Sequence, residues 1–196
     1  MQRVERGHSL VEMMGALVVV MALAGLGVPW LQAYIVEARL LGAGRIFKGE
    51  FLRARSIAAR SAVYTAIRFE RGADGNWVYS LYVDGNHNGV RADDIRRSID
   101  RRIAGPLRLD AGAAGVWVGI HPSVPAPPPG SGTLDPSRPI QFGNSAMLSF
   151  SPLGTATPGT FYLAGEMRQA AVRVTPGSAR VRLMIWSGGR RWTERS

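Results

Sequence analysis

The chain has 196 residues, a formal net charge of +10 at pH 7 and no cysteine. This length suits one ordinary domain with an appendage, and the lack of cysteine excludes disulfides and thiolate metal sites. Lys48 is the single lysine, so nearly all the positive charge is arginine. Anionic partners are consistent with that charge, although a genome bias toward arginine codons is the simpler explanation.

A long uncharged run lies near the start of the chain, from Met13 to Val36. As a helix it would rise about 36 Å, enough to cross a bilayer core of about 30 Å. The arginines in front of it favour a cytoplasmic N-terminus. We therefore expect a transmembrane helix over 8–36, with a cleaved secretory signal ending at Ala22-Leu23-Ala24 as the alternative.

The residues in front of this run carry a family resemblance. Gly7-His8-Ser9-Leu10-Val11-Glu12, followed by an apolar helix, resembles the leader of type IV pilins and type II secretion pseudopilins. In that family a prepilin peptidase cuts after the glycine, and the new N-terminus is methylated. The resemblance thus implies a leader over 1–7, with Gly7 and His8 as the cleavage and methylation site. Counted from His8, Glu12 and Pro29 stand where family members carry a glutamate and a proline.

The resemblance also implies assembly roles for Glu12 and Pro29. A lone carboxylate within a bilayer costs roughly 2.5–3.5 kcal/mol. In the family the glutamate is thought to pair with the N-terminal amine of a neighbouring subunit, which lowers that cost and sets the axial register. The alternative is that Glu12 only reaches the membrane interface. Pro29 cannot donate a helical hydrogen bond, so we expect a kink there.

An amphipathic helix is predicted to continue over 37–61. Its apolar residues recur at three- and four-residue steps. They are Val36, Leu40, Ala43, Phe47, Phe51, Ala54 and Ala58. The arginines of this stretch lie largely on the other faces, where a solvated role is expected.

Short strand patterns then fill 62–196, which we expect to be a β-rich head. Alternating apolar residues at 63–69 and 77–83 flank Asp74-Gly75, a hairpin signal. Further strands are expected at 107–110, 116–120, 147–151, 160–164, 169–175 and 180–186. Seven prolines make 121–139 an extended loop. The expected fold class is α+β: a long transmembrane and amphipathic helix packed on an antiparallel sheet or small sandwich.

The head resembles the minor pseudopilins of the GspH/FimT type. The stretches that carry the resemblance are "LYVDGNHNGVRADD", "LSFSPLGTATPGTFYL" and "ARVRL". It implies a single-pass inner-membrane protein with a periplasmic head. Such a protein assembles with other pilins into a filament for type II secretion or type IV pilus biogenesis. The implied partners are those pilins, the prepilin peptidase and the membrane. We expect no enzymatic activity and no cofactor, because no catalytic motif is present.

One loop partly fits a calcium site. Asp84, Asn86 and Asn88 stand at alternate positions, but the twelfth position holds Ile95 where a glutamate is required. We therefore expect no metal, and interpret the loop as a polar turn with Asx caps and glycines at positive φ.

The C-terminal stretch offers a DNA-binding alternative. Its basic and aromatic residues suit a nucleic-acid backbone and a stacking base. The candidates are Arg180, Arg182, Arg190, Arg191 and Trp192. Gly189-Arg190-Arg191-Trp192 resembles half of the motif of FimT-like minor pilins that act in DNA uptake. The competing interpretation is a basic strand followed by a frayed tail over 187–196.

Overall fold

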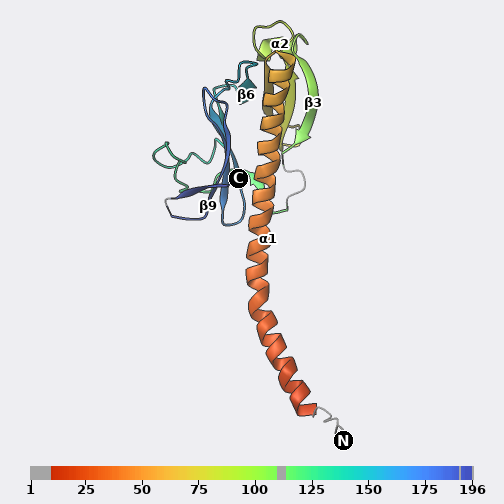
Figure 1. Cartoon of the computed structure of the whole chain (residues 1–196), viewed down its shortest axis with the longest axis vertical. Helices are drawn as coiled ribbons and strands as arrows, with labels where there is room; N and C mark the ends of the chain where they lie inside the picture. The colour runs from red at the N-terminus through yellow and green to blue at the C-terminus, as the bar shows by residue number, and fades with distance from the viewer. Residues whose placement is uncertain (1–9, 110–113, 190, 196) are drawn as a thin grey trace, which may run out of the picture. The chain divides into compact units, whose positions relative to one another are not determined.

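The computed structural model describes residues 10–109, 114–189 and 191–195, and within the first range it leaves out the side chains of 23–30, 32 and 33. The chain divides into two compact units, Met1–Val36 and Glu37–Ser196. Helix α1, Leu10–Ser61, begins in the first unit and ends in the second (Figure 1). Each unit is described by itself.

The expected fold class needs correction at the membrane helix. Within the described part of the chain, no helix is sufficiently long and apolar to cross a membrane. The sequence-based expectation treats all uncharged residues through Val36 as one span. The other part of the expected fold class, a mixture of helix and antiparallel strands, agrees with the structure. The strands form two sheets.

The first sheet has the strand order β3-β2-β1-β6, and all its pairs are antiparallel. Its strands are β1 (Thr65–Arg71), β2 (Trp77–Val83), β3 (Arg101–Arg108) and β6 (Met147–Phe150). The predicted hairpin at Asp74-Gly75 is confirmed, since Gly75 has φ 76° and the Gly72 N–H donates to the Asn76 carbonyl at 2.7 Å. Strand β3 begins earlier than the expected 107–110, because its exposed arginines hide the alternating pattern.

The second sheet has the order β10-β9-β8-β7-β4, and β5 also pairs with β7. Its strands are β4 (Trp117–Val118), β5 (Ile140–Phe142), β7 (Gly159–Ala164), β8 (Gln169–Val174), β9 (Val181–Trp186) and β10 (Trp192–Arg195). Strand β10 corrects the interpretation of the C-terminus as a frayed tail. It pairs with β9 from Trp192↔Trp186 to Arg195↔Leu183, so cross-strand hydrogen bonds order these residues.

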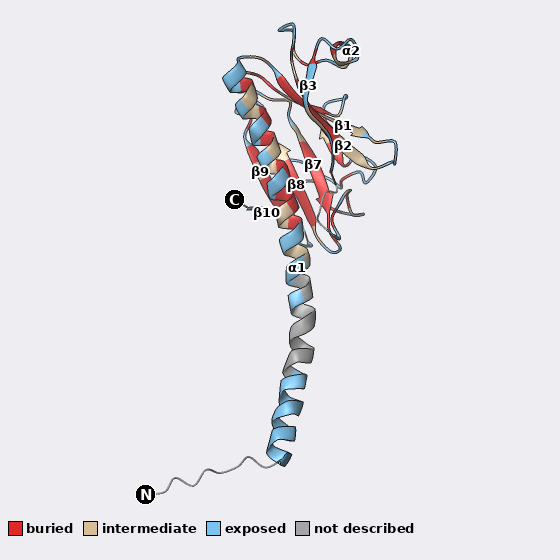
Figure 2. Ribbon diagram, turned by 90° about the vertical axis from the view of Figure 1, so that its right-hand side faces the viewer, coloured by how far each residue is buried: buried red, intermediate tan, exposed pale blue. Residues whose placement is uncertain are grey.

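The main core lies where the second half of α1 meets both sheets. Six of the seven residues of the predicted apolar face, from Leu40 to Ala58, are buried, and Val36 is half-buried. Figure 2 shows buried positions in red along the part of α1 that lies beside the strands. The Phe47 ring lies 6.0 Å from Tyr79 in the first sheet and 4.7 Å from Phe161 in the second. This aromatic contact joins helix and sheets into one hydrophobic cluster.

Irregular segments cover the outer face of each sheet. The proline-rich segment 121–139 contributes buried Val124 and Leu134 to a cluster with Tyr162 of β7 and Met184 of β9. It is therefore a packed cover and not merely an extended loop. On the first sheet, the segment around the short helix α2 (Ala92–Arg96) places Ile95 in a smaller cluster.

Candidate functional site

Apolar side chains cover the described N-terminal part of α1. Nine large ones are between 58% and 75% exposed: Leu10, Val11, Met13, Met14, Leu17, Val18, Val19, Val20 and Met21. They include five consecutive positions, so they point to all sides of the helix. A helix that is apolar all round is normally buried, and an exposed patch of this size marks an interaction site. We call residues 10–22 the N-terminal apolar segment.

The predicted processing and assembly residues are only partly within the described structure. Gly7 and His8 lie outside the described residues, and so does the side chain of Pro29. Glu12 lies in the first turn of α1 and is exposed. A carboxylate is favourable there, because the N-terminal end of a helix carries a partial positive charge. The roles expected for these four residues stay predictions.

The candidate calcium loop is organised by Asp84, which is 4% exposed. One of its carboxylate oxygens accepts from the Asn86 N–H at 3.0 Å and the other from the Gly89 N–H at 2.7 Å. Gly89 has φ 86°, and His87 also has a positive φ of 62°. The side chain thus caps the turn, as expected for an Asx loop.

Two further buried carboxylates hold this loop, and the sequence interpretation missed both. Asp100, 2% exposed, accepts from the Gly85 N–H at 3.1 Å and from the Arg91 N–H at 2.8 Å. Asp94 accepts from the Asn88 side-chain amide at 3.1 Å. The signal was present in "ADDIRRSID", but the burial of its aspartates depends on how α2 folds back onto the loop.

Hydrogen-bond donors surround these carboxylates. Among the described residues, no group of three or more His, Cys, Asp or Glu side chains could hold a metal ion. The side-chain amides of Asn86 and Asn88 both donate to one Asp94 oxygen, at 3.4 and 3.1 Å. The arrangement can order a loop, and we derive no metal chemistry from it.

The structure brings Arg180 and Arg182 together at one carboxylate. Glu194 of β10 lies 3.2 Å from an Arg180 nitrogen and 3.8 Å from an Arg182 nitrogen. Arg191 is exposed, and Arg190 lies outside the described residues. Because Glu194 offsets part of the charge of Arg180 and Arg182, these two arginines attract a phosphate backbone less than the sequence alone indicates.

Trp192, the predicted stacking residue, is engaged within the head. Its indole N–H donates to the Pro125 carbonyl at 2.9 Å, and its ring centroid lies 6.5 Å from that of Tyr162. It therefore attaches β10 to the proline-rich cover. A ring held in this way offers less free face for a base than an exposed one.

No family model, curated protein or solved structure matched the chain. Its function must therefore be inferred from the residues and contacts described above.

Proposed function

We propose that the chain is a minor subunit of a pilin-like filament, processed after Gly7 by a prepilin peptidase. It acts with other pilins in type II protein secretion or type IV pilus biogenesis, with its head in the periplasm at the inner membrane. The observation that carries the proposal is the N-terminal apolar segment. It begins three residues after Gly7, and Glu12 lies in its first turn.

Burial of the N-terminal apolar segment supplies the driving force for assembly. Fully burying a large aliphatic side chain contributes about 1.5–3 kcal/mol, and nine such side chains are exposed. Equivalent helices of neighbouring subunits would cover them in a filament core. The head needs no such cover, because its own two sheets bury the second half of α1.

In this proposal, Glu12 sets the axial register between neighbouring subunits. Cleavage after Gly7 would create an amine four residues before Glu12. In a packed bundle, that amine can meet the carboxylate of an adjacent subunit at only one axial offset. A buried pair of this kind selects one arrangement, even where it adds little net stability.

The processing experiment coexpresses the chain with a prepilin peptidase and determines the mass of the product. We expect the loss of residues 1–7 and a methylated His8 at the N-terminus. Gly7→Ala should remain uncut. Cleavage after Ala24, or no cleavage of the wild-type chain, would overturn the proposal.

The assembly experiment measures crosslinking of the processed chain to other pilins. Glu12→Gln should lose most of it, because the amide cannot pair with an amine as a charge. Glu166→Gln is the matched control, since it removes an exposed carboxylate from the head. Equal crosslinking by the two variants would remove Glu12 from the proposed register.

The DNA-binding alternative gains no support from the described residues of the C-terminal stretch, because Glu194 lies against Arg180 and Arg182. We therefore do not put it forward as a second function.

A further inference from the structure

Strand β3 forms an open edge of the first sheet. Among the strands that the structure describes it pairs only with β2, and six of its eight residues are exposed. An edge strand presents unpaired N–H and C=O groups along its free side. Its second half is poorly suited to further pairing, because Pro106 has no N–H and the register with β2 shifts again between Leu81 and Tyr79. The stretch left for pairing is Arg101–Ala104, in which the register with β2 is regular at Arg101 and Arg102 and shifts before Ala104.

Exposed arginines surround this stretch. Four of them have no carboxylate partner among the described residues: Arg91, Arg97, Arg101 and Arg102. The aspartates of the same segment do not offset them at the surface. Asp93 pairs with Arg96, while Asp94 and Asp100 are buried and accept hydrogen bonds from the loop. We call these four arginines with Arg101–Ala104 the β3 edge surface.

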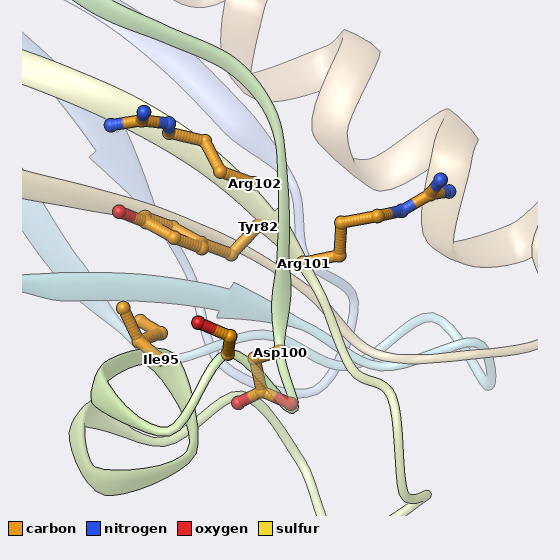
Figure 3. Close-up of a pocket in the computed structure, with 6 residues that line it drawn as sticks. Tyr82, Ile95, Asp100, Arg101 and Arg102 are labelled. Carbon is orange, nitrogen blue, oxygen red and sulfur yellow. The ribbon is translucent and has the colours of Figure 1, made fainter.

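A pocket of about 370 Å³ lies beside the β3 edge surface (Figure 3). Arg102 is the register partner of Tyr82 on β2, and Figure 3 shows both side chains on the same side of the sheet while Arg101 points the other way. Ile95 and Ser98 line the pocket from the α2 side. A strand added beside β3 would therefore direct alternate side chains toward the pocket with Arg102 and toward Arg101.

The chemistry of this surface favours an acidic peptide over a nucleic acid. Proteins bind single-stranded nucleic acids by stacking the bases on aromatic side chains whose ring faces are free, but Tyr82 is only 7% exposed. The exposed apolar residues of the edge, Ile103 and Leu107, are aliphatic. Main-chain hydrogen bonds along an open edge, combined with pockets for alternate side chains, are the features used to bind extended peptides.

We infer that the β3 edge surface binds an acidic, extended segment of a partner protein. The segment adds a strand beside Arg101–Ala104, and its carboxylates face Arg101 and Arg102 on the two sides of the sheet. One of its side chains enters the pocket lined by Tyr82 and Ile95. This inference holds whether or not the chain assembles into a filament, because it rests on the head alone.

The test measures fluorescence anisotropy of a labelled peptide of about eight residues with the repeat Glu-Glu-Val-Val, which places carboxylates on both faces of an added strand, and it uses the full chain in mild detergent. Arg101→Gln with Arg102→Gln should weaken binding about tenfold. Arg45→Gln with Arg60→Gln, which removes the same charge from exposed positions of α1, should weaken it less than about twofold. Arg101→Lys with Arg102→Lys should restore most of the binding.

Two further probes separate strand addition from diffuse attraction. The same peptide N-methylated along its backbone keeps its charges but loses its N–H donors, so its binding should fall about tenfold or more. Equal binding of the methylated and unmethylated peptides would overturn strand addition. Equal losses from the β3 and α1 variants would also overturn the inference. The inference would likewise be overturned if a single-stranded oligonucleotide bound more tightly than the acidic peptide and lost its binding in the Arg101 and Arg102 variant.

Discussion

Gly85 lies so close to the main chain of Ile99 that a β-carbon added to Gly85 would overlap the Ile99 carbonyl oxygen. A hydrogen bond next to this contact holds the two segments in place. Asp100, the next residue after Ile99, accepts the Gly85 N–H through its side chain. The backbone segments that flank α2 are therefore held together where only a glycine fits.

Gly85→Ala should lower the free energy of unfolding by about 3 kcal/mol, because the backbone that it would meet cannot rotate away as a side chain can. Urea denaturation of the full chain in mild detergent gives the value. Gly49→Ala is the control: apart from the chain neighbours and the adjacent backbone of α1, no atom of the described residues lies within 4 Å of the added carbon, so the change should raise stability by about 0.5–1 kcal/mol. If Gly85→Ala left the free energy of unfolding unchanged, the contact between Gly85 and Ile99 would not be tight in solution.

Asp100→Ala should cost about 2 kcal/mol, because it leaves the N–H groups of Gly85 and Arg91, whose hydrogen bonds are partly buried, without their acceptor. Asp93→Ala removes a carboxylate seven residues away that is exposed and, in the described part of the chain, forms an ion pair with Arg96 alone. That change should cost less than about 0.5 kcal/mol. Similar losses from the two substitutions in the same denaturation assay would contradict a structural role for Asp100.

Calcium should leave the melting temperature of the head transition unchanged. Both Asp84 oxygens already accept backbone N–H groups, and among the described residues no group of three or more His, Cys, Asp or Glu side chains could hold the ion. Scanning calorimetry with and without a chelator measures the effect. A ligand that binds only the folded state at 100 times its Kd would add about 2.7 kcal/mol, so a clear upward shift with calcium would restore the metal interpretation of this loop.

Arg190→Gln with Arg191→Gln should weaken nonspecific duplex DNA binding by the same factor as Arg45→Gln with Arg60→Gln. Both pairs remove two positive charges, and attraction by net charge does not depend on position. Titrations at several salt concentrations measure the affinity and the salt slope, which falls by about 0.9 for each phosphate that the variant no longer neutralises. A larger loss of affinity in the tail variant would revive the DNA-binding alternative.

Stability should fall as the pH rises above 10. Burial raises the pKa of Tyr162 above the ordinary value of 10.0, although the Thr160 hydrogen bond and Arg173 oppose the shift. The folded state therefore favours the neutral phenol. This contribution is fully present below the unfolded-state pKa and is lost as the pH rises through the higher folded-state pKa.

Urea midpoints at pH 8 and at about pH 11 measure this alkaline loss of stability. Tyr162→Phe, which has no phenol to ionise, should lose less than the wild-type chain. Tyr64→Phe removes the hydroxyl of an exposed tyrosine and should behave like wild type. An identical alkaline loss in Tyr162→Phe would assign the effect to other groups.

The sequence by itself determined the elements whose pattern is local. The spacing from Leu40 to Ala58 determined which face of α1 is buried, because residues three or four apart share one side of a helix. Asp74-Gly75 determined the β1–β2 hairpin, because a glycine readily adopts the positive φ that such a turn requires. The same local method failed at the N-terminus, where an uncharged run was interpreted as a membrane span.

Only the tertiary structure decided the contacts between distant segments. The pairing of β10 with β9 orders a C-terminus that looked frayed, and it brings Glu194 to Arg180 and Arg182. Asp100 reaches Gly85 only because α2 folds back over the loop. Neither contact leaves a periodic pattern in the sequence, because a charge or an N–H group meets its partner only when distant segments of the chain fold together. The electrostatics of the tail and of the β3 edge are for that reason properties of the fold and not of the composition.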